Sequence, residues 1–484
     1  MVFSGLPFLF FFLPAFLLCY LPAKGRAKNI VLLIFSLFFY AWGEPVYLFL
    51  MLFTTLIDYT AGRLMERYPV EQGDASEKEM RRKRRCLLIV AVSVNLCLLA
   101  FFKYADFAVR IANTLRGVLL QSVPPFPLPG IALPIGISFY TFQSMSYTID
   151  RYRGRVGVQK NYADYLTYVS MFPQLIAGPI VRYQTVEREL RERQAGRQDF
   201  LFGFRRFLIG LFRKVLIANQ VGALWDAIRT AQTLSVPSAW LGLLCFTLQL
   251  YYDFSAYSDM AIGLGRMMGF HFLENFNYPL SAVSITDFWR RWHISLSSWF
   301  KDYVYIPLGG NRKGLKRQLI NLLIVFFLTG LWHGAFLNYI LWGLYHGLFL
   351  VIEKFYLLRK IEWWPKWICH LYTIIIVVIG FGIFYFEDLN ALTLYAAKLF
   401  GAGEGGMAPA TDFLWYALNY LPQLVIACLC AFPLYPAIEK KIASVRGIQV
   451  PVSVLRGLFA ILFFAISIAS LVRDTYNPFL YFRF

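Results

Sequence analysis

Runs of apolar residues dominate this sequence, and the short stretches between them carry most of its charged residues. Pro7 to Leu21 and Leu87 to Phe102 contain no charged residue, and neither does the longer run from Leu319 to Ile352. An apolar stretch of about 18 or more residues can cross a bilayer as a helix. The pattern predicts an all-α polytopic membrane protein, with one domain over residues 1–484 and roughly ten to thirteen membrane segments, re-entrant helices included.

The placement of basic residues predicts the orientation of the chain. Lys24, Arg26 and Lys28 follow the first apolar run, and residues 61–85 end in an unbroken series of arginine and lysine from Arg81 onward. Cytoplasmic loops of membrane proteins carry an excess of these residues. Residues 61–85 are therefore predicted to be a basic cytoplasmic loop, and the N-terminus is expected on the extracytoplasmic side.

Two further segments do not have the pattern of a simple crossing. Tyr162 to Val181 contains Pro173 and Gly178 and lies between two basic clusters. This predicts a re-entrant segment, because irregular backbone at membrane depth is tolerated only where it is buried in protein or lines a cavity. Phe200 to Asn219 mixes phenylalanine and leucine with arginine and lysine, which predicts an amphipathic helix at the membrane surface.

The composition agrees with membrane residence and narrows the functional classes. Hydrophobic residues make up 58% of the chain and charged residues only 15%, whereas soluble domains are about a quarter charged. The formal net charge is +19. Because the basic residues flank apolar runs, this charge predicts membrane orientation and no nucleic-acid binding. The seven cysteines form no CxxC pair, so neither a disulfide framework nor a metal site is expected.

Histidine is scarce, and His333 stands in the most informative position. The run from Leu319 to Ile352 is too long for one span and is interrupted at Gly330 to Ala335, which includes His333. An imidazole inside a membrane segment is costly unless it faces a polar cavity, so His333 is a candidate for function, with a structural histidine as the alternative. His293 follows Phe-Trp-Arg-Arg-Trp, where an interfacial anchor is the alternative. His346 does not share a helix face with His333 at ideal spacing, so no pair is predicted.

Common catalytic motifs are missing from the sequence, and polar residues within apolar stretches stay ambiguous. G-x-S-x-G, H-E-x-x-H and the glycine-rich nucleotide motifs do not occur, so a serine hydrolase, a zincin and a P-loop protein are unsupported. Asp253 and Asp259 lie in an apolar stretch, as do Gln143, Tyr147 and Asp150. An acid in such a place is a functional candidate, and a polar network that packs helices together is the alternative.

Several longer motifs occur in order along the chain. They are Tyr252-Asp-Phe-Ser-Ala-Tyr-Ser-Asp259, Glu274-Asn-Phe-Asn-Tyr-Pro279, Asp287-Phe-Trp-Arg-Arg-Trp-His293, Asp302-Tyr-Val-Tyr-Ile-Pro-Leu-Gly-Gly-Asn-Arg312, Gly330-Leu-Trp-His333-Gly-Ala, Trp342-Gly-Leu-Tyr-His346-Gly and Asn477-Pro-Phe-Leu-Tyr-Phe-Arg-Phe484. Together they resemble the membrane-bound O-acyltransferase family, in its bacterial alginate O-acetylase branch. The protein that transfers D-alanine to teichoic acid is a more distant member.

The resemblance implies a helical fold around a central funnel and a particular set of site residues. The family's essential histidine falls on His333, and its second catalytic position falls on His293. Substrate-binding roles are expected for His346, Asp259, Trp332 and Asn311. No metal or bound cofactor is expected.

The reaction that the resemblance implies moves an acyl group, expected to be acetyl, from a thioester to a hydroxyl. The donor is a cosubstrate, either acetyl-coenzyme A or an acyl carrier protein, and it is expected at the cytoplasmic side. The neutral imidazole of His333 would remove the hydroxyl proton as general base. His293 would bind the thioester carbonyl oxygen or orient the donor.

The implied setting is O-acetylation of a polysaccharide outside the cytoplasm, by a multi-pass protein of the bacterial cell membrane. The expected partners are the lipid bilayer, the acyl donor, the polysaccharide and a separate extracytoplasmic acetyltransferase that completes the transfer. Three alternatives stay open: a transporter or flippase for a lipid-linked glycan with Asp253 and Asp259 as a relay, D-alanyl transfer to teichoic acid, and a scaffold for a secretion complex.

Overall fold

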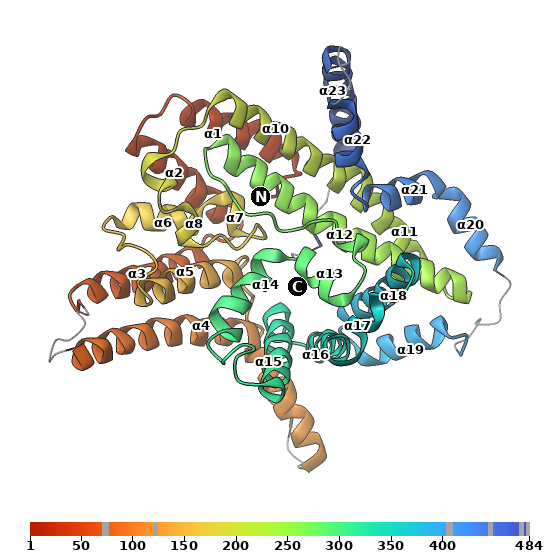
Figure 1. Cartoon of the computed structure of the whole chain (residues 1–484), viewed down its shortest axis with the longest axis horizontal. Coiled ribbons are helices and arrows are strands. Elements are labelled where there is room, and N and C mark those ends of the chain that lie inside the picture. The colour runs from red at the N-terminus through yellow and green to blue at the C-terminus, as the bar shows by residue number, and fades with distance from the viewer. Residues whose placement is uncertain (70–76, 120–123, 403–409, 444–448, 474–478, 481–484) are drawn as a thin grey trace. The chain divides into compact units, whose positions relative to one another are not determined.

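The structure is a computed structural model that describes residues 1–69, 77–119, 124–402, 410–443, 449–473 and 479–480. These ranges are built from helices and contain no strand (Figure 1). The predicted all-α class is therefore confirmed. Contacts within the chain divide it into two compact units. The first unit comprises Met1, Pro7–Phe204 and Ala261–Leu273, and the second comprises Val2–Leu6, Arg205–Met260 and Glu274–Phe484. A single domain over the whole chain stays a prediction.

The first unit contains the N-terminal helices and ends within two helices that continue into the second unit. In chain order they are η1 (Phe8–Phe12), α1 (Leu13–Tyr20), α2 (Arg26–Ala41), α3 (Tyr47–Glu66), α4 (Glu77–Leu119), α5 (Ile137–Tyr152), α6 (Tyr162–Ser170), α7 (Phe172–Leu175), α8 (Tyr183–Val186), α9 (Glu189–Glu192), the start of α10 (Arg197–Phe212) and the end of α12 (Val236–Met267).

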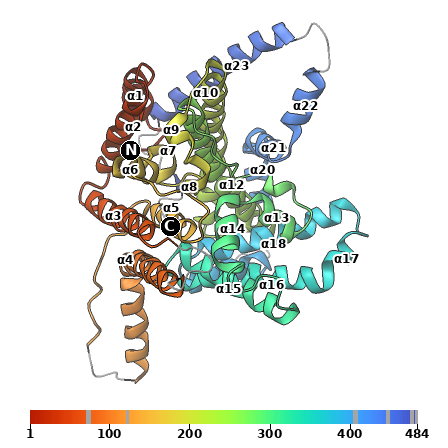
Figure 2. The ribbon, with the colours of Figure 1, turned by 60° about the vertical axis from the view of Figure 1, so that its left-hand side comes forward.

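A polar cluster holds three helices of the first unit together. Asp58 of α3 is fully buried. Its carboxylate accepts hydrogen bonds from Asn95 Nδ2 of α4 at 2.8 Å, from Thr148 Oγ1 of α5 at 2.5 Å and from the hydroxyl of Ser144. Because buried polar groups must find partners, these bonds fix α3, α4 and α5 side by side, as Figure 2 shows.

Residues 61–85, predicted as a basic loop, are largely helical. The end of α3 covers 61–66 and the start of α4 covers 77–85. A cytoplasmic connection between membrane segments can be helical, so these bounds do not test the prediction. Arg81 lies 2.7 Å from Glu77, one helical turn earlier, and such pairs stabilise a helix that extends into water. Residues 70–76 lie outside the described residues, and the cytoplasmic placement stays a prediction.

The predicted re-entrant segment is a pair of short helices enclosed by the first unit. The chain breaks at Met171, between α6 and α7. The break leaves the backbone amide of Phe172 without a helical acceptor, and this amide donates to the hydroxyl of Ser36 at 3.1 Å. All residues from Tyr165 to Val181 are buried. The irregular backbone therefore lies inside protein, where such backbone is tolerated, and its depth in a membrane stays a prediction.

The second unit contains most of α12 and the remaining helices. They are η2 (Arg213–Ala218), α11 (Asn219–Arg229), η3 (Pro279–Ser281), α13 (Ile285–Arg291), α14 (Ile294–Phe300), η4 (Lys301–Tyr305), α15 (Leu315–His333), α16 (Leu337–Ile352), η5 (Glu353–Leu357), α17 (Leu358–Ile361), α18 (Lys366–Tyr385), α19 (Leu389–Leu399), α20 (Thr411–Asn419), α21 (Leu421–Cys430), α22 (Leu434–Ala443) and α23 (Gln449–Arg473).

The run from Arg197 to Arg229, through α10, η2 and α11, is long and apolar enough to cross a membrane. This measure uses length and composition alone, so the surface helix expected at 200–219 stays a prediction. Two cations of the segment are paired within the second unit. Arg213 Nη1 lies 2.5 Å from Asp259 Oδ2. Lys214 Nζ lies 2.5 Å from Asp253 Oδ1. The π-helical turn η2 widens the helix where these two consecutive residues both reach α12.

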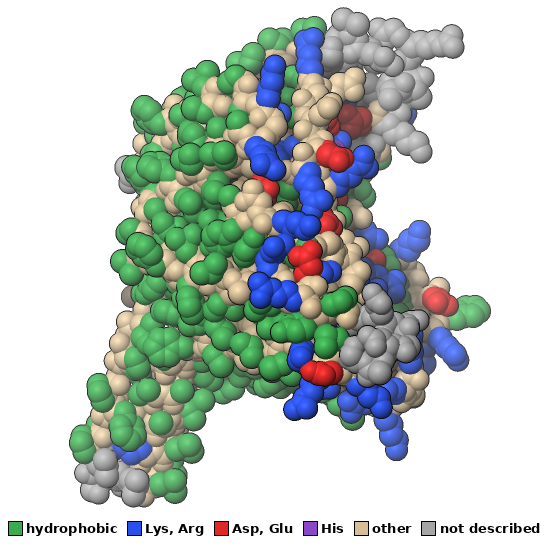
Figure 3. Space-filling view, turned by 90° about the vertical axis from the view of Figure 1, so that its left-hand side faces the viewer, with side chains coloured by type: hydrophobic (Ala, Val, Ile, Leu, Met, Phe, Trp, Pro, Cys, Tyr) green, Lys and Arg blue, Asp and Glu red, His purple; other side chains and the backbone are tan. Residues whose placement is uncertain are grey.

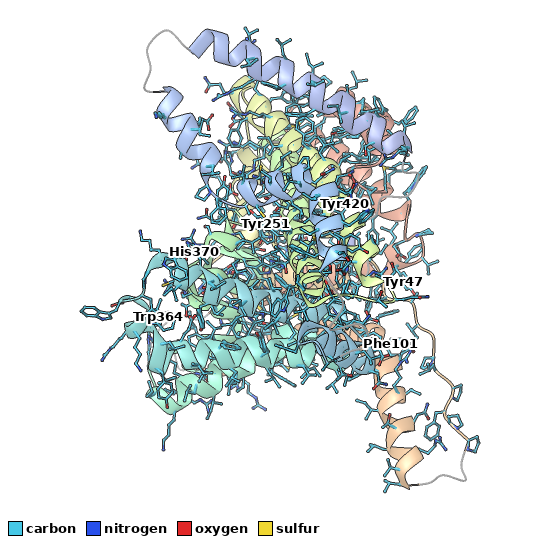
Figure 4. The ribbon with its side chains drawn as sticks, turned by 90° about the vertical axis from the view of Figure 1, so that its right-hand side faces the viewer. Tyr47, Phe101, Tyr251, Trp364, His370 and Tyr420 are labelled. Carbon is cyan, nitrogen blue, oxygen red and sulfur yellow. The ribbon has the colours of Figure 1, made fainter. Side chains whose placement is uncertain are left out.

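Seven helices of the described residues are long and apolar enough to span a membrane. Helices α20 and α21 add an eighth if they form one broken span, and they meet at a bend of 70° near Tyr420 (Figure 4). The predicted ten to thirteen segments also counted short and re-entrant ones, such as the apolar helix Phe8–Tyr20. Figure 3 shows a broad hydrophobic face bordered by lysine and arginine side chains, the distribution expected where hydrocarbon meets lipid headgroups.

Candidate active site

His333 is the last residue of α15, and the chain turns immediately after it. Gly334 to Phe336 separate α15 from α16, so the predicted interruption of the long apolar run is confirmed. His333 is 8% exposed. Its ring lies against those of Trp342 and Phe384, with centroid separations of 5.0 and 5.2 Å. The turn therefore places the imidazole in an aromatic environment.

Two glycines let α15 and α16 approach closely enough to position His333. A Cβ atom on Gly330 would collide with the backbone oxygen of Tyr339, and one on Gly343 would collide with that of Phe326. Small residues allow helix backbones to pack in this way in membranes. The two helices lie side by side (Figure 1), and His333 follows Gly330 by less than one turn.

Histidine and tryptophan rings alternate through the second unit. The members of this His–Trp series are, in order, His293, Trp332, His333, Trp342 and His346. Each ring meets the next edge to face, at centroid separations of 6.0, 5.0, 5.0 and 5.4 Å. Edge-to-face contacts are favourable between aromatic rings. The structure therefore brings four of the predicted site residues together, and Trp332 contacts both catalytic candidates.

His293 is held by an uncommon backbone conformation and by Asn275. It precedes α14 with a φ of 45°, in the left-handed region that few residues other than glycine adopt. Such strain persists only where the surroundings enforce it. Nδ1 of His293 lies 3.2 Å from Oδ1 of Asn275. Burial lowers the pKa of His293 to about 3, so its ring is neutral at physiological pH.

His346 is fully buried, and its surroundings tie α16 to the helix that precedes His293. The ring of Trp289, from α13, lies 5.2 Å from that of His346. The buried carboxylate of Glu353, just after α16, accepts hydrogen bonds from the first two backbone amides of α13 at 2.5 and 2.7 Å. Carboxylates are stabilised at helix N-termini by such amides. Helix α16 and its extension therefore hold the His293 segment at two points.

Asp259 lies in an ion-pair cluster. Its Oδ1 is 2.7 Å from Arg206 Nη2, and its Oδ2 is 2.5 Å from Arg213 Nη1. Arg206 also pairs with Glu274 at 2.6 Å. Two cations and two carboxylates thus neutralise one another, which agrees with the polar-network alternative for Asp259. A substrate-binding role for Asp259 stays a prediction.

Asn311 is exposed in the turn between η4 and α15, and no described contact joins it to the His–Trp series. Its predicted role in substrate binding is untested, as is that of Trp332 and His346.

The sequence reading overlooked two residues, Asn275 and Glu353. Asn275 belongs to the motif Glu274 to Pro279, so membership of that motif was a usable signal. Glu353 follows a long apolar run, and a charge at such a place was the signal that could have identified it.

The arrangement suits proton transfer in surroundings that exclude water. A neutral imidazole can take a proton from a hydroxyl while that hydroxyl attacks an acyl group. Tightly packed aromatic side chains keep out water, which would otherwise compete as a nucleophile. Within the described ranges, no three His, Cys, Asp or Glu side chains converge as a set of metal ligands would.

Comparison with known proteins identifies similar chains. The model of the membrane-bound O-acyltransferase family matches residues 34–396. A probable alginate O-acetylase of Pseudomonas putida is 38% identical over the whole of both chains. A peptidoglycan O-acetyltransferase of Helicobacter pylori is 34% identical over 72% of this chain and 69% of its own. A teichoic acid D-alanyltransferase of Bacillus subtilis is 29% identical over 53% of this chain and 68% of its own.

Proposed function

This chain belongs to the membrane-bound O-acyltransferase family, and from that premise we propose that it transfers an acetyl group from a thioester to hydroxyls of an extracytoplasmic polysaccharide. The observation that carries the proposal is the shared contact of His293 and His333 with the ring of Trp332. The choice of acetyl is supported by the names of two relatives, which O-acetylate alginate and peptidoglycan.

His333 is the general base of the proposed reaction. The hydroxyl oxygen attacks the thioester carbonyl carbon, and the C–S bond breaks as the C–O bond of the ester forms. The hydroxyl proton passes to the imidazole of His333 and from there to the leaving thiolate, so the histidine ends the cycle neutral. General-base catalysis of this kind contributes about 10²–10⁴-fold. Trp332 and Trp342 hold the imidazole in position from two sides.

The donor in this proposal arrives from the cytoplasm, as acetyl-coenzyme A or an acetylated carrier protein. Both carry the same kind of thioester, so the chemistry at His333 does not depend on the choice. Arg151, Arg153 and Arg155 belong to a segment expected on the cytoplasmic side. Such basic residues attract the phosphates of coenzyme A or an acidic carrier protein.

The proposed location is the inner membrane of a bacterium, with the N-terminus on the extracytoplasmic side. The acetyl group then crosses the membrane within this chain. It reaches the polysaccharide either directly or through a separate extracytoplasmic acetyltransferase.

The transporter alternative loses support because its relay would need Asp253 and Asp259 to exchange protons. Lys214 lies 2.5 Å from Asp253, and Asp259 is held by two arginines. Protonating either carboxylate would leave a cation without its counter-charge in a partly buried setting, which is costly. The D-alanyl alternative rests on a relative that matches about half of this chain.

A His333→Ala variant tests the proposed base. Protein reconstituted in liposomes is supplied with radiolabelled acetyl-coenzyme A or acetylated carrier protein, and with polysaccharide fragments. Loss of the base is expected to lower acetyl transfer by about 10²–10⁴-fold. The measurement is label on the polysaccharide or on a partner transferase.

His271→Ala is the matched control, because His271 is half-exposed and pairs with Glu189 in the first unit. It is expected to transfer acetyl at the normal rate. Normal transfer by a His333→Ala protein that inserts correctly would rule His333 out as the base. Movement of a glycan without acetyl transfer would favour the transporter.

A further inference from the structure

The orientation of the Asn275 side chain is fixed by its neighbours. Asn275 is fully buried. Its Oδ1 lies 3.1 Å from the backbone nitrogen of Ser295, a group that can only donate a hydrogen bond. The atom at this place must therefore be the amide oxygen and not the amide nitrogen. The Nδ2 group donates to the hydroxyl of Ser258 at 3.1 Å.

The same oxygen determines which nitrogen of His293 carries the proton. Nδ1 of His293 lies 3.2 Å from Oδ1 of Asn275. An unprotonated Nδ1 would set its lone pair against those of the oxygen, whereas a protonated Nδ1 donates a hydrogen bond. The hydroxyl of Ser295 also reaches this oxygen, at 2.9 Å, and its proton can rotate to suit. A neutral imidazole has a single N–H, so a proton on Nδ1 leaves a lone pair on Nε2.

We infer that Asn275 is a positioning residue that holds His293 as the tautomer protonated on Nδ1, so that Nε2 accepts a hydrogen bond from a second hydroxyl of the acceptor sugar, beside the hydroxyl whose proton passes to His333. The tautomer follows from the contacts of Asn275, and only the identity of the hydroxyl rests on the proposed function. The role is the reverse of one expected from the sequence. A lone pair on Nε2 cannot donate a hydrogen bond to a thioester carbonyl oxygen.

The lone pair on Nε2 of His293 lies in buried, apolar surroundings. The residue is 1% exposed, and Nε2 has no hydrogen-bond partner among the described residues. The rings of Phe254 and Trp332 face it at centroid separations of 4.8 and 6.0 Å. A buried hydrogen-bond acceptor without a partner is unfavourable, so a ligand group that donates a hydrogen bond to it gains binding free energy. A sugar carries several hydroxyls, so the acceptor supplies such a donor beside the hydroxyl that gives its proton to His333.

Nitrogen NMR reads the tautomer directly. The full chain is prepared with ¹⁵N-labelled histidine in lipid bilayers at pH 8, without donor or acceptor. The sequence holds only five histidines, and a His293→Gln variant assigns the His293 signals by their loss. We expect a protonated Nδ1 and an unprotonated Nε2. A proton on Nε2 with a bare Nδ1 would overturn the inference.

Two variants test whether Asn275 is the cause. Asn275→Leu removes the acceptor, so the Nε2-protonated tautomer is expected to appear and kcat to fall at least tenfold. Asn275→Asp keeps an oxygen at the same place, so it is expected to retain the Nδ1-protonated tautomer and to recover part of the lost kcat. Asn390→Leu, at an exposed position on α19, is the control and should leave the His293 signals unchanged.

The outcomes separate the tautomer from the proposed function. If Asn275→Leu does not fold, the spectra of the wild type and of Asn275→Asp still decide, and Nε2 protonation in either would contradict the inference. If His293 carries its proton on Nδ1 while the protein transfers no acetyl group, the proposed function fails and the assignment of Asn275 stands.

Discussion

At the scale of single residues, one indole links the two histidines of the proposed reaction. Trp332 is 4% exposed, and its ring contacts those of His293 and His333. Trp332 directly precedes His333 at the end of α15. A change at this position therefore disturbs both imidazoles together, and effects of variants at these three residues should not add.

The buried, neutral state of His293 predicts a dependence of stability on pH. Burial lowers the folded-state pKa of His293 from 6.5 to about 3. Below pH 6.5 the unfolded chain binds a proton that the folded protein does not, so stability falls as the pH drops toward 3. For this one group the loss is about 2 kcal/mol at pH 5 relative to pH 8.

Thermal unfolding in detergent, measured from pH 8 to pH 5, checks this dependence. The wild type is expected to lose stability more steeply than His293→Gln, which has no such group. Parallel curves for the two proteins would show that His293 is protonated in the folded state. His271→Gln serves as the control, because that side chain is half-exposed.

Asn275 and Glu353 were not identified from the sequence, because their hydrogen-bond partners lie far from them along the chain. Glu353 hydrogen-bonds the amide of Ile285, 68 positions away. Asn275 meets His293 across 18 positions. Only the folded chain brings these groups together. By contrast, His333 could be predicted because the break in the apolar run is a local feature of the sequence.

At the scale of helices, the contact between α15 and α16 sets the place of His333. Gly330→Ala is expected to force the helices apart, because the new methyl group would meet the backbone of Tyr339. Backbone cannot move aside as a flexible side chain can, so the cost should resemble overpacking, about 1–3 kcal/mol. Acetyl transfer should fall with the displacement of His333.

The thermal midpoint and the rate of acetyl transfer of Gly330→Ala test this expectation. Gly457→Ala is the matched control, because a Cβ atom there meets nothing within 4 Å. It should leave both quantities close to those of the wild type. A Gly330→Ala protein as stable and active as the control would contradict the close approach of the two helices.

Helix α13 depends on Glu353 for its first turn. Glu353→Ala leaves the buried amide of Ile285 and the partly buried amide of Thr286 without this acceptor, and an unsatisfied buried group costs about 1–3 kcal/mol. Because α13 leads into His293, acetyl transfer should fall along with stability. Glu353→Gln retains one acceptor oxygen and should lie between the wild type and Glu353→Ala.

Thermal unfolding and acetyl transfer are measured for both Glu353 variants. Glu362→Ala provides the control at an exposed glutamate nearby. If Glu353→Ala matches that control in both measurements, the hydrogen bonds to α13 do not position the site.

The sequence predicted features of the helices that depend on the local pattern of residues. It did not predict features that depend on a contact with another helix. The break between α15 and α16 was predicted from the length of the run and its glycines. The ion pair of Arg213 could not be predicted, because its partner Asp259 lies on α12. The helical parts of residues 61–85 were not foreseen, because the run of charges hides the ion pairs one turn apart that sustain a helix there.

At the scale of the second unit as a whole, ion pairs between the Arg197–Arg229 run and α12 neutralise charges that would be costly to bury alone. Asp259→Asn leaves Arg213 without this carboxylate, and breaking a buried pair costs about 3–5 kcal/mol. The double variant Asp259→Asn with Arg213→Leu should recover part of that loss, since no charge is then left alone. Thermal midpoints of the two single variants and the double variant give the coupling.

Asp226→Asn is the control for this cycle, because Asp226 forms an exposed pair with Arg229 that should contribute about 0–1 kcal/mol. If Asp259→Asn were no more harmful than this control, the cluster around Asp259 would be dispensable for folding. The substrate-binding role predicted for Asp259 would then be favoured over a structural role.

The order in which the chain is synthesised gives the Arg213–Asp259 pair a further importance. Asp259 follows Arg213 by 46 residues, so at about 5–20 residues per second the arginine waits roughly two to nine seconds for its carboxylate. Meanwhile a charge at the centre of a lone membrane helix costs about 2.5–3.5 kcal/mol on insertion scales. The segment around Arg213 and Lys214 is therefore expected to stay at the translocon until Asp259 has been synthesised and the ion pair can form.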